Sequence, residues 1–579
     1  MLCCNKKILN NDYFKPESQF SLIFKREMNI PSFNAIIEQS IIKNWDLDAM
    51  TDFKGPTLQY HDVARKIEKL HILFENCGVV KGDKIAICGR NSANWAVAFL
   101  ATLTYGAVVV PILNEFLPEQ IHNIVNHSES KLLFVGDVVA TQIDATKMNG
   151  LEGIVYIPDY SLVVSRTEKL TYAREHLNEI FGKKYPKYFR KEHVSYYKES
   201  SPEELAVLNY TSGTTGFSKA VMIPYRAIWS NFDFAVSVFD NKISAGDKIV
   251  SILPMAHMYG LMFEFLFQFG IGVQIYFLTR MPSPAIISQA FKEVKPRVVI
   301  AVPLVIEKVI KKHVFPKVQG SLMKMLRSTP ILKDKINARI CDQVYQVFGG
   351  NFYEVIIGGA SFNQDVDEFL HEIGFPYTVG YGATECAPII GYEDWHNFKP
   401  GSCGKAAKHQ EVKIDSPNPE KIPGEILTRG LNVMLGYYKD DQSTSLILDK
   451  EGWYHTGDLG LMDEEGNIFI KGRSKNMLLG ASGQNIYPEE IEDKLNSMPY
   501  VMESIVVQRG EKLVGLVYPD YDEAKNLGIS SSDIQNIMED NRNQLNSIIP
   551  SYSKVSTIEI VEEEFEKTPK KSIKRYLYK

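Results

Sequence analysis

Cysteine is scarce in this sequence and is not arranged in pairs. The 579 residues include 7 cysteines, of which only Cys3 and Cys4 are neighbours. No CxxC pair occurs and the total is odd, which excludes a disulfide framework and a zinc site built from paired cysteines. The pattern predicts reduced thiols in a cytoplasmic protein.

Long hydrophobic runs and an excess of positive charge are also missing. No window of about 18 uninterrupted apolar residues occurs, so no transmembrane helix is expected. The formal net charge of -6 gives no electrostatic argument for nucleic acid or an anionic membrane as the main partner. Peripheral contact with a membrane stays open.

The first 27 residues lack the apolar run of roughly 7 to 15 residues that a secretory signal needs. This leader is polar and irregular. We expect either a disordered extension over residues 1–27 or a true start at Met28, and the sequence leaves both readings open.

The sequence instead alternates short β-type runs with helical segments. Residues 84–89 predict a buried strand, residues 92–106 a helix with an apolar face, and residues 107–112 the next strand. A strand–helix–strand unit of this kind favours a parallel sheet. With 45% hydrophobic and 23% charged residues, the composition is typical of a soluble globular protein. We therefore predict the α/β class.

Strand-like runs followed by glycine-rich loops recur at residues 297–303, 353–360 and 377–385. In open α/β sheets, ligands bind beyond the carboxyl ends of the strands. The segments that follow these runs are therefore where we expect the functional site.

The pattern changes after Arg429 to short turns and charged hairpins. The last hundred residues or so mix strand-like runs with a polar helix near residues 531–548. We predict a large domain over residues 28–474, with mostly parallel sheets flanked by helices. A small, mobile α+β domain is expected over residues 475–579.

The stretch YTSGTTGFSKAV, residues 210–221, is rich in hydroxyl side chains and glycine and contains one lysine, Lys219. Such a loop offers backbone N–H groups and hydroxyl donors to a phosphate. It does not match the Walker spacing, because Gly213 and Gly216 are too close together. Composition alone leaves a flexible surface turn as probable as a phosphate cradle.

This stretch resembles the phosphate loop of the adenylate-forming superfamily, whose pattern is roughly YTSGTTGxPKGV. The sequence departs from it at Ser218 and Ala220 and keeps the lysine. Further blocks of that superfamily follow in its order. They are GGAS (358–361), GYGATE (380–385), YHTGD (454–458), KGRSKN (471–476) and GQNIYPEEIE (483–492).

The resemblance implies an ATP site assembled from several of these blocks. Tyr381 would stack on adenine, Thr384 would meet the α-phosphate, Glu385 would hold magnesium and Asp458 would bind the ribose hydroxyls. Lys219, Thr384 and Glu385 are the implied catalytic residues of this part of the chain. The implied ATP- and AMP-binding residues are Thr211, Ser212, Gly213, Thr214, Thr215, Gly216, Gly359, Ala360, Ser361, Tyr381, Gly382, Asp458 and Arg473.

The resemblance also implies an acyl pocket and a moving small domain. His257, in LPMAHMYG, and Gly380 would lie beside the acyl pocket. Lys475 would be the hinge, and Gly483 would belong to the loop that faces coenzyme A during the second half-reaction.

Each of these residues has an ordinary structural interpretation as well. On spacing alone Asp458 is a turn residue, Glu385 a solvated carboxylate and Tyr381 a core aromatic ring. A lone histidine such as His257 is more often a satisfied buried side chain than a functional one. The order of the blocks favours the functional interpretation for the first three and leaves His257 balanced.

The C-terminal tail departs from the pattern T-P-x-x-K-x-x-R. The sequence TPKKSIKR, residues 568–575, has Ser572 where the lysine of the first half-reaction should fall. Lys571 is one residue away and Lys574 two, and we take Lys571 as the catalytic candidate. The alternative is that the first half-reaction is slow or lost.

The residues of these blocks are most similar to those of bacterial long-chain fatty acyl-CoA synthetases. In HMYGLMFEFLFQFG, residues 257–270, Glu264 is the only charge, which favours an uncharged hydrophobic substrate tail. The resemblance implies that ATP and magnesium activate a medium- or long-chain fatty acid, which then passes to coenzyme A. Two alternatives stay open, namely transfer to an acyl carrier protein and a catalytically impaired nucleotide-binding protein.

Overall fold

An eight-stranded sheet forms the largest sheet of the molecule, in the order β20-β9-β8-β4-β3-β5-β6-β7. The computed structural model describes residues 30–211, 219–280, 283–318, 330–479, 484–510, 512–568 and 573–578. The strands of this sheet are β3 (Lys84–Cys88), β4 (Val108–Ile112), β5 (Ser130–Val135), β6 (Gly153–Tyr156), β7 (Leu162–Ser165), β8 (Leu205–Tyr210), β9 (Ala220–Pro224) and β20 (Gly436–Tyr437).

The predicted strand–helix–strand unit is present within this sheet. Strands β3 and β4 are parallel, with Lys84 opposite Val108, and helix α4 (Ala93–Tyr105) connects them. The Ser92 hydroxyl accepts a hydrogen bond from the Trp95 N–H and starts the helix, and Gly106, at φ 84°, ends it. The α/β prediction is therefore confirmed.

Two further sheets are wholly or mostly parallel. Their orders are β10-β11-β1-β2 and β12-β13-β14, and only β2 is antiparallel to its neighbour. The strands are β1 (Asp48–Asp52), β2 (Thr57–Gln59), β10 (Lys248–Ser251), β11 (Gln274–Phe277), β12 (Val299–Ala301), β13 (Val355–Ile357) and β14 (Tyr377–Val379).

Antiparallel sheets follow these in the chain. They have the orders β15-β16-β17 and β18-β19-β21-β22. The strands are β15 (Tyr381–Gly382), β16 (Ile389–Tyr392), β17 (Lys405–Ala406), β18 (Gln410–Asp415), β19 (Gly424–Gly430), β21 (Tyr454–Met462) and β22 (Ile468–Arg473).

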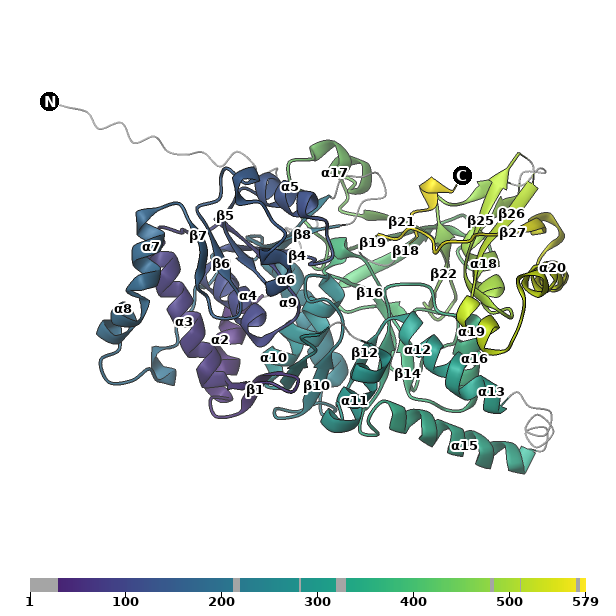
Figure 1. Cartoon of the computed structure of the whole chain (residues 1–579), viewed down its shortest axis with the longest axis horizontal. Helices are drawn as coiled ribbons and strands as arrows, with labels where there is room; N and C mark the ends of the chain where they lie inside the picture. Colours follow the sequence, from purple (N-terminus) through teal and green to yellow (C-terminus); the bar gives the residue numbers. More distant parts are fainter. Residues whose placement is uncertain are drawn as a thin grey trace.

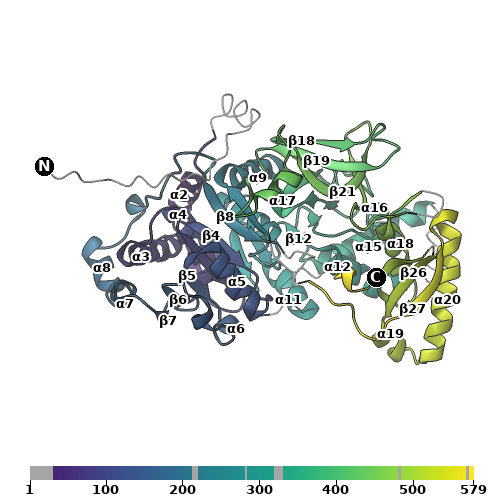
Figure 2. The same cartoon turned by 90° about the horizontal axis from the view of Figure 1, so that it is seen from above.

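Helices flank the parallel sheets, as Figures 1 and 2 show. They are α2 (Phe33–Lys43), α3 (Tyr60–Cys77), α5 (Pro118–Ser128), α6 (Asp137–Ala140), α7 (Glu168–Glu175), α8 (Leu177–Lys184), α9 (Tyr225–Phe239), α10 (Phe267–Ile271), α11 (Pro284–Val294), α12 (Pro303–Val309), α13 (Phe315–Val318), α15 (Pro330–Val347), α16 (Gln364–Glu372) and α17 (Asp441–Ile447). None of the helices in the described part of the chain is both long and apolar enough to cross a membrane.

The C-terminal residues form a smaller α+β unit at one end of the molecule (Figure 1). Its elements are β23 (Leu478–Leu479), β24 (Asn485–Ile486), α18 (Pro488–Asn496), β25 (Val501–Arg509), β26 (Lys512–Pro519), α19 (Tyr521–Asn526), α20 (Ser531–Ile548) and β27 (Val555–Ile560). Its buried apolar residues belong to two clusters of their own, separate from the main core. The placement of a domain boundary at Lys475 stays a prediction.

Polar contacts connect this unit to the rest of the chain. The Asn363 side chain, which caps α16, donates hydrogen bonds from Nδ2 to Asp493 Oδ1 at 3.2 Å and to Ser497 Oγ at 2.5 Å. Nearby, Lys311 Nζ donates to the Asn496 carbonyl at 3.3 Å. Helix α18 is thus held against the N-terminal end of α16.

Candidate functional site

The stem of the predicted phosphate loop lies at the carboxyl end of β8. The Thr211 N–H donates to the Lys219 carbonyl at 2.9 Å, which continues the antiparallel pairing of β8 with β9. Strand β8 runs parallel to β4, so this stem lies at the sheet edge where ligands of α/β proteins bind. Ser212, Gly213, Thr214, Thr215 and Gly216 lie outside the described residues.

Lys219 and Glu385 contact different parts of the same side chain, that of Tyr437. Lys219 Nζ lies 4.6 Å from the centre of the Tyr437 ring, and the Tyr437 hydroxyl donates to Glu385 Oε1 at 2.9 Å. Strand β20 places Tyr437 because it pairs with β9, with Tyr437 opposite Val221. This contact could not be predicted from the sequence, since a tyrosine in a short strand normally only packs. Thr384, adjacent to Glu385, is buried.

Tyr381, Asp458 and Arg473 form a second group. The Tyr381 hydroxyl donates to Asp458 Oδ2 at 2.6 Å, and Arg473 Nε lies 2.7 Å from Asp458 Oδ1. Strands β21 and β22 pair so that Asp458 is opposite Arg473. Burial raises the pKa of Asp458, and the Arg473 guanidinium opposes that rise. Both carboxylate oxygens are therefore oriented by donors.

The GGAS turn lies at the carboxyl end of β13. Gly359 has φ +90°, a conformation that favours glycine, and Gly359, Ala360 and Ser361 are exposed. Gly358 is covered by an aromatic ring, because a Cβ there would lie 3.2 Å from the Tyr259 ring. The Tyr259 hydroxyl also donates to the Ile356 carbonyl at 3.1 Å.

His257 lies in a bend that precedes this tyrosine. Its Nδ1 accepts a hydrogen bond from the Tyr259 N–H at 3.3 Å, and its side chain is half-buried. Tyr259 therefore connects His257 to β13, the strand that ends in the GGAS turn. The roles of His257 and of the turn stay predictions.

The glycines of the GYGATE block differ in their surroundings. A Cβ at Gly382 would lie 2.3 Å from the Pro388 carbonyl oxygen, so no other residue fits there without a backbone shift. At Gly380 the nearest atom would be 3.6 Å away, which is an ordinary contact. The close packing at Gly382 fixes the backbone between Tyr381 and Thr384.

Lys475 is exposed, in a turn directly after β22. The chain on both sides of it is held: the Ser474 N–H donates to the Gly457 carbonyl at 2.9 Å, and Asn476 Nδ2 donates to Glu489 Oε1 at 2.6 Å. Gly483 and Lys571 lie outside the described residues, as does Ser572. Lys574 Nζ lies 3.0 Å from Glu566 Oε2.

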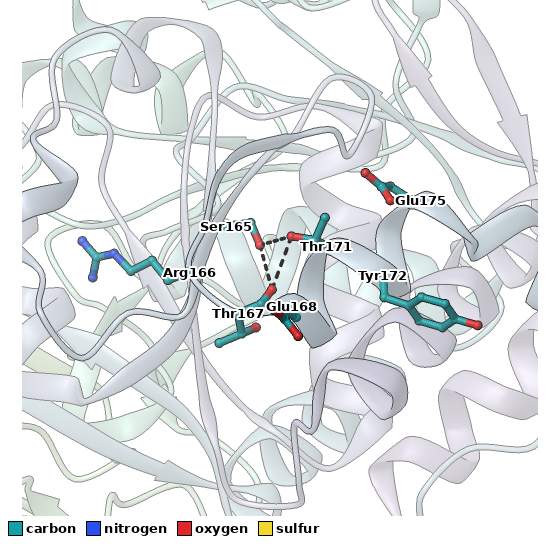
Figure 3. A pocket seen from close by; sticks show the side chains of 7 residues that line it. All are labelled: Ser165, Arg166, Thr167, Glu168, Thr171, Tyr172 and Glu175. Carbon is teal, nitrogen blue, oxygen red and sulfur yellow. Dashed lines mark hydrogen bonds between the residues drawn. The ribbon is translucent and has the colours of Figure 1, made fainter.

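The pocket in Figure 3 is not part of this arrangement. It lies on β7 and α7, and β7 is the sheet edge opposite to β20. Its hydroxyls satisfy one another, since Ser165 Oγ and Thr171 Oγ1 are 2.8 Å apart, and Arg166 turns away from it to donate to the Met148 carbonyl at 2.7 Å. A larger cavity of about 580 Å³, with Asn91 on its wall, opens beyond the ends of β3, β5 and β6.

Comparison with known proteins decides the family. A family model described as AMP-binding enzyme matches residues 37–438, and the model of the AMP-binding enzyme C-terminal domain matches residues 475–578. The chain belongs to the AMP-binding enzyme family. The resemblance of its sequence blocks to that superfamily is therefore confirmed.

This AMP-binding enzyme has relatives of similar length. The long-chain-fatty-acid–CoA ligase of Escherichia coli O157:H7 is 27% identical over 512 residues, covering 83% of this chain and 84% of the relative. The indoleacetate–CoA ligase of Aromatoleum aromaticum is 27% identical over 480 residues, covering 81% and 84%. The crystal structure of the anthranilate CoA ligase AuaEII with anthranoyl-AMP has a TM-score of 0.74 at 18% identity, covering 95% and 97%, and supports the fold.

Glu385 fits a magnesium ion that arrives with ATP. Among the described residues no three His, Cys, Asp or Glu side chains gather into a metal site. An ion bridging phosphates needs only one or two carboxylates. One oxygen of Glu385 is oriented by Tyr437, and the same tyrosine holds the Lys219 cation nearby. The donor set suits a metal shared with phosphate and does not form a resident cage.

The Tyr437 hydroxyl can be tested apart from its ring. Tyr437→Phe is expected to lower acid-dependent pyrophosphate exchange about tenfold, because it removes a hydrogen bond to a charged group. Tyr437→Leu should lower it about fivefold further, since the ring under Lys219 is lost too. Tyr438→Phe is the control, as that hydroxyl donates to Glu129 Oε2 at 3.1 Å. Equal rates for Tyr437→Phe and Tyr438→Phe would contradict the bridging role.

Proposed function

We propose that this AMP-binding enzyme is an acid–CoA ligase that activates a medium- or long-chain fatty acid as its acyl-adenylate. The observation that carries the proposal is the position of Tyr381 and Glu385 in one short block. Tyr381 contacts Asp458 and Arg473, and Glu385 contacts Tyr437 beneath Lys219. One block thus joins a group suited to a nucleoside with a group suited to phosphates.

In the first half-reaction the substrate carboxylate oxygen attacks the α-phosphorus of ATP. A P–O bond forms, the bond to the β-phosphate oxygen breaks, and pyrophosphate leaves. Catalysis of this kind is mainly positioning and neutralisation of charge on the phosphate oxygens. Lys219 and the donors from Thr211 to Thr215 would supply that neutralisation, with Thr384 at the α-phosphate. Magnesium on Glu385 would neutralise further phosphate charge.

Asp458 would hold the ribose. Its carboxylate is fixed between Tyr381 and Arg473, and it can accept hydrogen bonds from two neighbouring hydroxyls. The exposed GGAS turn and the Tyr381 ring would enclose the adenine. These proposed roles rest on the family resemblance together with the geometry of Tyr381, Asp458 and Arg473.

The only charged residue of the predicted acyl segment, Glu264, is not available to a charged substrate, which supports an uncharged substrate tail. Glu264 is fully buried, and its carboxylate accepts hydrogen bonds from Ser251, Ile252 and Leu253. It is therefore occupied and cannot pair with a substrate ammonium group. The neighbouring side chains of this segment are apolar, which suits a hydrocarbon chain.

In the second half-reaction the CoA thiolate attacks the acyl carbon and AMP leaves. The small C-terminal unit would rotate about Lys475 to bring the loop of Gly483 to the site. The CoA-ligase names of the relatives favour coenzyme A over an acyl carrier protein as the acceptor.

The hinge predicts that a substitution at Lys475 affects only the second of the two half-reactions. Lys475→Pro should leave pyrophosphate exchange nearly unchanged and lower thioester formation from preformed adenylate at least about tenfold, because proline fixes φ. Lys475→Ala, which keeps φ free, is the matched control and should behave as wild type. Equal loss of both half-reactions in Lys475→Pro would count against the hinge.

The proposed function is tested by pyrophosphate exchange with carboxylic acids of graded chain length, followed by AMP release on addition of CoA. Exchange that rises with chain length and CoA-dependent AMP release are the expected results. A lack of exchange with every acid, while ATP still binds, would support the impaired nucleotide-binding alternative that Ser572 and Ala220 suggest.

A further inference from the structure

Glu264 is an unusual residue in its surroundings. It lies in a π-helical segment, residues 260–266, whose other residues are apolar or glycine, and it is 0% exposed. A buried carboxylate is costly unless donors surround it. Burial raises the pKa of Glu264 to about 8, while its hydrogen bonds lower it.

This carboxylate accepts hydrogen bonds from three donors of one short stretch. Ser251 Oγ donates to Oε2 at 2.9 Å, the Leu253 N–H to Oε2 at 3.0 Å, and the Ile252 N–H to Oε1 at 3.2 Å. These donors follow or end strand β10. The carboxylate thus accepts hydrogen bonds from backbone N–H groups of Ile252 and Leu253, which follow β10.

Asn91 holds the same stretch from the other side. Its Nδ2 donates to Ser251 Oγ at 3.1 Å and to the Leu253 carbonyl at 2.6 Å, and its Oδ1 accepts from the Met255 N–H at 2.9 Å. The Ser251 hydroxyl therefore accepts from Asn91 and donates to Glu264. One continuous hydrogen-bond chain crosses the bend.

Asn209 and Gly260 also hold the stretch that follows β10 in place. Asn209, two residues before Thr211, donates from Nδ2 to the Ala256 carbonyl at 3.0 Å. A Cβ at Gly260 would lie 2.8 Å from the Pro254 carbonyl oxygen, so the bend packs directly on the start of the π-helical segment. Residues 252–256, which we name the clamped bend, are held by side chains from three separate parts of the chain.

The clamped bend leads directly to two residues of the candidate site. His257 follows it, and Tyr259 contacts Gly358 and the Ile356 carbonyl below the GGAS turn. Asn209 connects the bend to the strand that carries the phosphate loop. A displacement of the bend would therefore move the predicted acyl pocket relative to both nucleotide-binding segments.

We propose that Glu264 is a positioning residue, which fixes the clamped bend and thereby the acyl pocket beside His257. The carboxylate does not touch substrate; it acts through the backbone N–H groups of Ile252 and Leu253. This inference rests on the proposed function for its kinetic consequence, but the fixation of the bend does not depend on it.

Glu264→Gln tests the inference, with Glu354→Gln as the matched control. Glutamine keeps the size of the side chain but turns an NH2 group toward at least one donor. Glu354 is also 0% exposed, burial likewise raises its pKa to about 8, and its partner is the Tyr392 hydroxyl. The two variants thus remove equally buried carboxylates at different places.

Amide hydrogen exchange measures the bend without any turnover. Faster exchange at residues 252–256 in Glu264→Gln, and unchanged exchange there in Glu354→Gln, is the expected result. Equal protection of the bend in both variants overturns the inference even if the enzyme proves to be a fatty acid ligase.

Kinetics then measure the acyl pocket. In Glu264→Gln the KM for the fatty acid should rise about tenfold while the KM for ATP changes less than about twofold, and Glu354→Gln should change neither. Asn91→Ala acts on the same bend from a half-buried position and should reproduce the rise if Glu264→Gln does not fold. An unchanged acid KM in Asn91→Ala and Glu264→Gln overturns the inference, whereas absent activity in wild type overturns the proposed function alone.

Discussion

Asp458→Ala is expected to lower acid-dependent pyrophosphate exchange at least a hundredfold. The carboxylate is 5% exposed and is fixed by Tyr381 at 2.6 Å and Arg473 at 2.7 Å. Its removal takes away the proposed acceptor of two ribose hydroxyls and leaves the Tyr381 hydroxyl without that partner. Two hydrogen bonds to a charged group, at about 1.5–3 kcal/mol each, correspond to at least a hundredfold in kcat/KM.

The control for this variant lies in the same β21–β22 hairpin. Asp463 forms an ion pair with Lys399 at 2.8 Å and caps the turn, away from Tyr381 and Arg473. Asp463→Ala should lower thermal stability and leave the KM for ATP within about twofold of wild type. Matching rates for the two variants would show that Asp458 serves the fold and not the nucleotide.

Lys571→Ala is expected to lower pyrophosphate exchange about a hundredfold and to leave thioester formation from preformed adenylate intact. The reason is that Lys571, in its proposed role, would supply a cation that neutralises developing charge in the first half-reaction only. Lys574→Ala should stay near wild type, because Lys574 pairs with Glu566 within the tail. Both variants are measured by exchange and by single-turnover thioester formation.

The outcome separates the alternatives for the tail. A large loss of pyrophosphate exchange in Lys574→Ala, with Lys571→Ala unchanged, would assign the catalytic role to Lys574 instead of Lys571. Unchanged exchange in both variants, in an active wild-type enzyme, would mean that the first half-reaction proceeds without a tail lysine, as Ser572 suggests.

Local patterns were sufficient to predict the strand–helix–strand unit at residues 84–112. The run of residues 84–112 contains its own strand signals, a serine cap and a glycine stop, and the structure has β3, α4 and β4 there. Short-range rules work here because propensity, periodicity and capping agree within a few residues. The family could be recognised for a different reason, namely the order of blocks that each are weak alone.

The contacts that the sequence did not reveal are long-range. Tyr437 meets Lys219 only because β20 pairs with β9, more than 200 residues away in the chain. The contacts of Glu264 span a shorter distance: its donors lie 11 to 13 residues earlier, at and after the end of β10, and the bend between them brings them to the carboxylate. Pairings of this kind depend on topology, which spacing along the sequence does not encode.

The contact between α16 and α18 has a thermodynamic consequence for the nucleotide. Asn363, which donates to Asp493 and Ser497, follows the GGAS turn after only one intervening residue, Phe362. A nucleotide on this turn and the docked small unit would therefore contact the same short segment, residues 358–363. By linkage, any factor by which docking strengthens nucleotide binding is the factor by which the nucleotide strengthens docking. If ATP binds this turn as proposed, it would also shift the equilibrium between the docked and undocked positions of the small unit.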